Sequence, residues 1–286
     1  MEKNKIIDWI LRVIKGMFIG SGAILPGVSG GALAAVFGVY ERIIAFLSNI
    51  RKDFKKNVLF FIPVGIGGVF GFFILAHPIN HFLNIAPIQT LWCFIGCILG
   101  TLPALFKEAG KNGRKSWHLV LTAITAAVAF AGLFLAKMYM SVEVPQNFGT
   151  WMMAGAIFVF GFIVPGLSPS NFLMYMHLYE PMTAGIKNLD LAILVPVGIG
   201  AVLCVLVFAK LVGYLMKKAY APIFHFILGI VVASTAIIVP TSKEFSTELQ
   251  NLGVGGIAVS AVLCLAGIAL GFWMGRLDDK YRPEKA

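Results

Sequence analysis

The sequence predicts an all-α polytopic membrane protein, and the prediction rests on composition, long apolar segments and two broken helical regions. Of its 286 residues, 59% are hydrophobic and 13% are charged, and the mean hydropathy is +0.88. Soluble domains carry about 25% charged residues. A chain of this size with so few charges cannot cover a water-exposed surface, so we expect it to lie in a lipid bilayer.

Six segments are apolar over the length that crosses a bilayer, about 20 residues of helix. They are residues 58–76, 88–106, 117–137, 191–215, 222–240 and 253–275. Two further regions, 6–50 and 148–187, each contain two apolar stretches divided by a Pro-Gly pair, which breaks a helix. We predict a re-entrant helical hairpin in each. If the hairpin arms cross fully, the chain has ten spans in place of six spans and two hairpins.

The first arm of the earlier hairpin favours the re-entrant form. Asp8, Arg12 and Lys15 interrupt its first part, which leaves only Gly16–Leu25 fully apolar before the break. A helix of that length covers about 15 Å, half of a bilayer core. We therefore expect an amphipathic interfacial turn, then a half-helix that enters the membrane, breaks at Pro26-Gly27 and returns.

The positions of Lys and Arg predict the topology, because basic residues concentrate in cytoplasmic loops. With both termini in the cytoplasm, 20 of the 23 Lys and Arg residues fall at or towards the inside, and Lys137, Lys187 and Lys243 fall outside. The net charge of +10 is therefore assigned to loops on one side of the bilayer. No basic tract indicates nucleic-acid binding.

The two Pro-Gly regions belong to an internal repeat. Pro26-Gly27-x-Ser29 corresponds to Pro165-Gly166-x-Ser168, and Tyr40-Glu41 corresponds to Tyr179-Glu180 at the same offset of 139 residues. The sequence PVGIG at 63–67 recurs at 196–200, and Ala86-Pro87-Ile88 recurs loosely as Ala221-Pro222-Ile223. This ordered series of matches predicts two structurally similar halves.

The second half is predicted to be inverted. An odd number of crossings, three or five, separates the two Pro-Gly regions, so the second enters from the opposite face. Inverted repeats with broken helices that meet near the midplane are typical of secondary transporters. Within one transmembrane domain at 1–286, we assign repeat 1 to 6–106, a linking helix to 117–137, repeat 2 to 148–240 and a final helix to 253–275.

The broken helices predict an anion site. Backbone freed inside a membrane persists only where protein or a wet cavity surrounds it, and each half-helix after a break exposes N–H groups with partial positive charge. Two such ends that meet would bind phosphate or carboxylate. The predicted substrate-binding residues are Pro26, Gly27, Ser29, Gly30, Gly31, Arg42, Pro165, Gly166, Ser168, Ser170 and Asn171. In the alternative, the Pro-Gly pairs only kink helices and the glycines serve close packing.

Charged residues within the hairpins are candidates for coupling to an ion. Glu41 and Arg42 lie about 13 Å of helix below the basic cluster at Arg51, and Glu180 occupies the matching place in the second copy. Arg42 would bind an anionic head group, and the two glutamates would carry protons or coordinate sodium. The alternative is an ordinary salt bridge near the membrane interface.

Metal and cofactor sites are not expected. Cys93 and Cys97 lie four residues apart on one helix face, but no His or acidic residue nearby completes a site. His77, His81 and His177 are scattered along the chain.

Four motifs together resemble the bacterial polyprenyl-phosphate transporters: GAILPGVSGG at 22–31, GVYERI at 38–43, PVGIG at 63–67 and PGLSPSN at 165–171. The resemblance extends over nearly the whole chain. It implies a flippase, not an enzyme, that returns undecaprenyl phosphate from the outer to the cytoplasmic leaflet of the bacterial inner membrane for carrier-lipid recycling in cell-wall synthesis. The implied partners are polyprenyl phosphate and membrane lipids, and a homo-oligomer and the coupling ion stay open.

Two alternatives fit part of the pattern. Undecaprenyl-pyrophosphate phosphatases also combine inverted repeats, re-entrant helices and a Pro-Gly-x-Ser start, but their motif continues with an arginine. Here Ser29 is followed by Gly30-Gly31 and Ser168 by Pro169-Ser170, whereas phosphoryl transfer depends on nearby cations. A small-anion secondary transporter would use the same donors.

Overall fold

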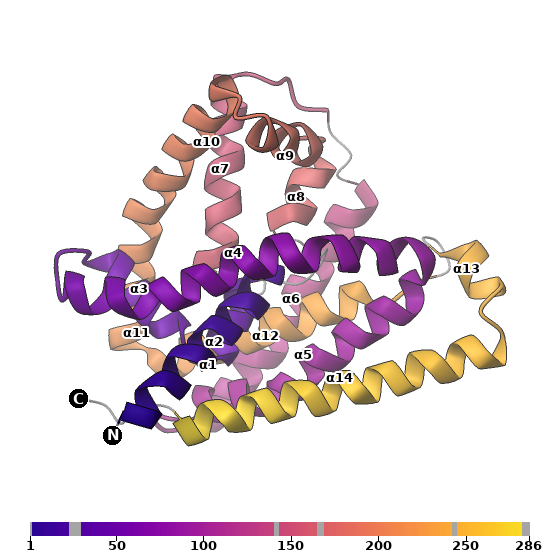
Figure 1. Cartoon of the computed structure of the whole chain (residues 1–286), viewed down its shortest axis with the longest axis horizontal. Coiled ribbons are helices and arrows are strands. Elements are labelled where there is room, and N and C mark those ends of the chain that lie inside the picture. Colours follow the sequence, from indigo (N-terminus) through magenta and orange to yellow (C-terminus); the bar gives the residue numbers. More distant parts are fainter. Residues whose placement is uncertain (1, 23–29, 140–142, 165–168, 242–244, 282–286) are drawn as a thin grey trace.

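The computed structural model describes residues 2–22, 30–139, 143–164, 169–241 and 245–281, and among these none forms a β-strand (Figure 1). The helices are α1 (Glu2–Ser21), α2 (Gly30–Val36), α3 (Tyr40–Ser48), α4 (Phe54–Ile85), α5 (Pro87–Ala109), α6 (Ser116–Tyr139), α7 (Phe148–Ile163), α8 (Pro169–Tyr175), α9 (Tyr179–Lys187), α10 (Leu191–Cys204), the π-helix η1 (Val205–Ala209), α11 (Lys210–Lys218), α12 (Tyr220–Ile238), α13 (Ser246–Gln250) and α14 (Gly253–Tyr281). The predicted all-α membrane class is confirmed.

The six predicted spans all appear among the described residues. They are Phe54–Gly71, Pro87–Ala109, Ser116–Ala136, Leu191–Lys218, Tyr220–Ile238 and Gly253–Trp273. Two thirds of the α12 span is buried, compared with 11% of the α14 span. Helix α12 therefore occupies the centre of the bundle, whereas α14 lies along α5 at the edge, where its apolar side chains suit a lipid environment (Figure 1).

The first arm differs from the prediction. Helix α1 is continuous over 20 residues, so there is no separate interfacial turn and ten-residue half-helix. Its charges do not end it because they have protein partners: Arg12 pairs with Asp8, and the Lys15 ammonium donates to the Phe37 carbonyl at 3.1 Å. A helix of this length measures about 30 Å, the thickness of a bilayer core, which removes the length argument for a re-entrant first arm.

Glycine contacts explain why PVGIG occurs twice. A Cβ on Gly67 would lie 1.9 Å from the Val13 carbonyl oxygen, so α1 and α4 touch backbone to backbone. In the second half, a Cβ on Gly200 would lie 1.7 Å from the Met152 carbonyl oxygen, where α7 meets α10. The last glycine of each PVGIG copy is therefore the point at which a spanning helix meets the helix that precedes a Pro-Gly element.

Helices α1 and α4 run in the same direction. The Val13 carbonyl meets Gly67, and the Met17 carbonyl, one turn later, meets Gly71, one turn later in α4. The chain must therefore return between them, and α2 with α3 forms this return. The first Pro-Gly region thus begins and ends at the same end of the α1–α4 pair, an arrangement compatible with the loop charges.

The turn between α2 and α3 recurs between α8 and α9. Gly38 and His177, which are 139 residues apart, both adopt a positive φ, 66° and 53°. The hydrogen bond from Val39 N to Ala34 O is matched by that from Leu178 N to Leu173 O, both 2.9 Å long. The local structure of the two halves therefore repeats at the offset that the Pro-Gly motifs indicate.

One sequence match is wrong by two residues. Ala86 has φ −147° and ψ 60° where α4 gives way to α5, and Ala219 has φ −141° and ψ 54° at the equivalent break before α12. The structural partner of Ala86 is therefore Ala219 and not Ala221. The offset is then 133 residues, the same as for the two PVGIG copies.

Candidate functional site

The structure brings together the segments that flank the two Pro-Gly elements. Helix α2 begins at Gly30, directly after the first element, and α7 ends at Ile163, just before the second. A Cβ on Gly31 would lie 2.8 Å from the Phe162 carbonyl oxygen, so the start of α2 rests against the end of α7. The predicted residues Pro26, Gly27, Ser29, Pro165, Gly166 and Ser168 lie outside the described residues, as does the side chain of Asn171.

Tyr40 forms a hydrogen bond at this junction. Its hydroxyl donates to the Ile163 carbonyl, which lies at the end of a helix where intrahelical donors are missing. The tyrosine is 1% exposed, and its ring meets that of Phe224 edge to face at 6.5 Å. A residue of the first half thus satisfies the helix end that precedes the second break. The repeated Tyr-Glu pair was the sequence signal for it, although the prediction selected only the glutamates.

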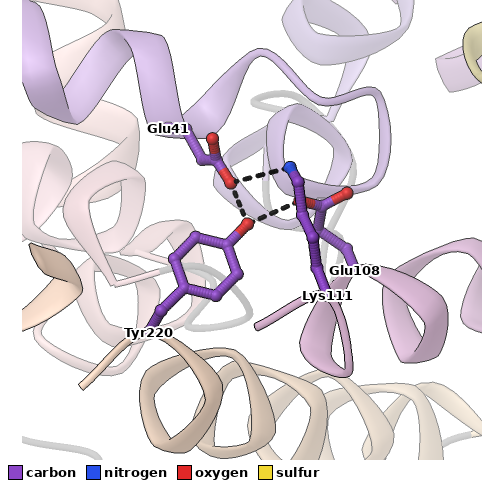
Figure 2. A network of polar contacts seen from close by, with 4 residues as sticks. All are labelled: Glu41, Glu108, Lys111 and Tyr220. Carbon is purple, nitrogen blue, oxygen red and sulfur yellow. Dashed lines mark hydrogen bonds and ion pairs between the residues drawn. The ribbon is translucent and has the colours of Figure 1, made fainter. Parts of the chain in front are cut away.

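Glu41 belongs to a polar cluster that joins the two halves. The Tyr220 hydroxyl contacts carboxylate oxygens of both Glu41 and Glu108, and Lys111 forms ion pairs with the same two glutamates (Figure 2). The distance from Lys111 Nζ to Glu41 Oε1 is 3.5 Å. These side chains come from α3, the end of α5, the turn that follows it, and the start of α12.

In this cluster a single phenol hydrogen lies between two carboxylates. A phenol has one hydrogen, so Tyr220 donates to one carboxylate at a time, and its contact with the other carboxylate is satisfied when that group carries a proton. The Glu41 side chain is 34% exposed and that of Glu108 is 12% exposed, so protons can reach the cluster from water.

A small depression adjoins the cluster. Its volume is about 180 Å³, and Glu41, Ser48, Lys217 and Tyr220 are among the residues that line it. None of Glu108, Lys111 and Tyr220 was selected from the sequence, because Tyr220 has the features of an interfacial tyrosine and the other two fall in a charged loop.

The remaining predicted residues are Arg42, Glu180 and Ser170. The Arg42 guanidinium donates to the Asn57 side chain at 3.0 Å and to the Lys56 carbonyl at 3.3 Å, and it lies over the Phe60 ring at 3.9 Å. These contacts direct it to the start of α4 and not to the Gly31–Ile163 junction. Glu180 is exposed on α9, and Ser170 is buried at the start of α8.

Sequence reasoning also missed a buried histidine pair. His118 on α6 and His225 on α12 have ring centroids 5.0 Å apart. His225 is 0% exposed, its Nδ1 lies 2.7 Å from the Ala221 carbonyl, and its Nε2 has no hydrogen-bond partner among the described residues. Among these residues, no group of three potential metal ligands is found.

The six spans define a polytopic helical membrane protein. Two broken regions and a polar cluster between the halves lie within it. The chain belongs to the VCA0040-like family, described as undecaprenyl phosphate translocase-like, whose model matches residues 19–256. It is 26% identical over 265 residues to a polyprenyl-phosphate transporter of Vibrio cholerae serotype O1, covering 87% of this chain and 84% of that protein.

A second relative is the polyprenyl-phosphate transporter of Staphylococcus aureus, 26% identical over 245 residues, which cover 81% of this chain and 86% of that protein. No solved structure matches the chain. The family expected from the four motifs is confirmed.

Proposed function

We propose that this protein moves undecaprenyl phosphate across the bacterial cytoplasmic membrane, from the outer to the inner leaflet, and so recycles the carrier lipid of cell-wall synthesis. The family description and the names of the two relatives support polyprenyl phosphate as the transported lipid. The observation that carries the proposal is the junction at Gly31 and Ile163, where the flanks of both broken regions meet.

The phosphate is proposed to bind at this junction. The Pro-Gly elements, with Ser29, Ser168, Ser170 and Asn171, would supply backbone and side-chain donors, as oriented dipoles do for other anions. The close approach at Gly31 supports this arrangement, because it brings the start of α2 to the end of α7 inside the protein. Arg42 stays a candidate only for recruiting the lipid at the membrane surface, since its present contacts are with α4.

Transport is proposed to follow alternating access between inverted halves. The matching turns at an offset of 139 residues and the parallel α1 and α4 support two similar units that rock about the junction. The Glu41 cluster would hold the halves together on the cytoplasmic side. Loss or gain of its proton would weaken or restore this contact, which couples transport to a proton gradient. Glu180 is the proposed counterpart in the second half.

The test uses purified protein in sealed liposomes with undecaprenyl phosphate in both leaflets. A membrane-impermeant binder reports the phosphate exposed outside over time, with protein-free liposomes as the control. Release of inorganic phosphate from undecaprenyl pyrophosphate and uptake of free phosphate are followed in parallel. We expect movement between leaflets without either side activity. Phosphate release would indicate a phosphatase, and uptake of free phosphate alone would indicate a small-anion transporter.

A further inference from the structure

An apolar groove runs along α7 on the side that faces α10 and the π-helix η1. Its volume is about 540 Å³, and all the residues that line it are apolar or glycine. Ala156 and Phe160 contribute from α7, and Leu203, Val207 and Phe208 contribute from α10 and η1. No charged or hydroxyl-bearing side chain lies in its wall, so the groove is suited to hydrocarbon and not to a phosphate.

The local backbone explains the shape of the groove. At Gly200 the backbone of α10 contacts the Met152 carbonyl of α7, so the two helices lie very close together at this point. Five residues later the chain forms η1, and a π-turn is wider than an α-turn because it holds an additional residue. Val207 and Phe208 of this turn reach the groove, and the Phe208 ring meets that of Phe160 edge to face at 4.9 Å.

One end of the groove lies near the proposed phosphate site. Along α7 its lining extends from Gly149 to Phe160, a distance of about 16 Å of helix. Phe160 is three residues before Ile163, whose carbonyl accepts from Tyr40 at the junction of the broken regions. One end of the groove therefore lies within a helical turn of the junction, and the other lies at the start of α7.

We propose that this groove holds the isoprenoid chain of the transported lipid while the phosphate occupies the junction, an inference that rests on the proposed function. The position of Phe160, three residues before Ile163 at the junction, favours this occupant over an ordinary phospholipid chain. The small residues at Ala156 and Gly200 and the flexible Met152 provide room for methyl branches. Lipid tails are as apolar as the groove itself, so the groove acts by packing and by orienting the chain.

The first test places a bulky side chain in the groove. Val207 lines it and is 61% exposed, whereas Val202 is 58% exposed on the same helical run and does not line it. We expect Val207→Trp to slow the movement of undecaprenyl phosphate in sealed liposomes by about tenfold, about 1.4 kcal/mol in the activation free energy, because the indole fills space that the isoprenoid chain would occupy. Val202→Trp, the matched control, keeps the wild-type rate. Equal rates for the two variants would overturn the proposal.

The second test detects the chain directly and does not depend on transport. Undecaprenyl phosphate with a photoreactive group on its isoprenoid chain is irradiated with the wild-type protein in a bilayer, and the labelled peptides are mapped. Labelling of 149–160 and 200–208 that excess unlabelled undecaprenyl phosphate prevents supports a tail groove, even if transport itself is not observed. Equal labelling by a photoreactive phospholipid, or cross-links between two copies of the chain at these residues, would overturn it.

Discussion

Tyr40 shows how one side chain stabilises a broken helix inside a membrane. Its hydroxyl supplies the donor that the Ile163 carbonyl lacks at the end of α7, and a bilayer core offers no water to replace it. At Glu41, the next residue, acceptors outnumber donors: its carboxylate and that of Glu108 share the one hydroxyl hydrogen of Tyr220. These adjacent residues therefore connect α3 to both halves through different chemistry.

At the residue scale, Tyr40→Phe removes the hydroxyl and keeps the ring. The buried Ile163 carbonyl loses its partner, so we expect the free energy of unfolding in detergent to fall by about 1–3 kcal/mol. Tyr214→Phe is the matched control, because the exposed Tyr214 hydroxyl accepts a long hydrogen bond from Lys218 at 3.5 Å, and this variant should stay within about 0.5 kcal/mol of wild type. A Tyr40→Phe protein as stable as that control would contradict the assigned hydrogen bond.

Glu41→Gln tests proton coupling at the cluster. The amide keeps the shape but can neither ionise nor take up a proton, so we expect transport in liposomes to lose its response to an imposed proton gradient. Stability should change by less than about 1 kcal/mol, because the side chain is one third exposed. Glu248→Gln on α13 serves as an exposed control. A gradient response that persists in Glu41→Gln would exclude Glu41 as the coupling residue.

At the scale of elements, glycine positions decide how closely helices approach. The two glycines of the second PVGIG copy differ in this respect: a Cβ on Gly200 meets the Met152 carbonyl, whereas a Cβ on Gly198 meets nothing within 4 Å. Backbone contact of this kind replaces hydrophobic burial as a source of specificity between membrane helices. The motif thus contains one glycine required for packing and one that is not.

Gly200→Ala and Gly198→Ala should therefore have opposite effects. The methyl group at 200 forces α7 and α10 apart, and we expect a loss of about 1–3 kcal/mol in the free energy of unfolding. At 198 the methyl meets open space, and the gain in helix propensity is at most about 1 kcal/mol. Thermal unfolding in detergent measures both. Equal destabilisation by the two substitutions would show that the α7–α10 contact is not the one described.

At the scale of the whole molecule, corresponding elements of the two halves should end on opposite sides of the membrane. Asn49 and Asn188 are exposed residues that follow α3 and α9, and they are 139 residues apart. We expect Asn188→Cys in intact cells to react with a membrane-impermeant maleimide, and Asn49→Cys to react only after lysis. The wild-type chain, whose four cysteines lie in apolar helices, is the control. Labelling of both variants from one side would refute an inverted repeat.

The sequence alone determined the features that are local along the chain. The six spans follow from the length and hydropathy of separate segments, and residues 63–67 and 196–200 reveal the repeat because the same helix contact needs the same glycine. The family followed from motifs that each lie within ten residues. The continuity of α1 escaped prediction because the partners of its charges, such as the Phe37 carbonyl, lie in another helix.

Only the tertiary structure decided which distant groups meet. Tyr40 and Ile163 are 123 residues apart, and Glu41 and Tyr220 are 179 apart. No periodicity or spacing encodes such pairs, because they depend on how glycine contacts set the register of whole helices. The same holds for His118 with His225 and for the groove beside η1. Hydropathy assigns residues to the membrane, and helix packing then determines which of them form a site.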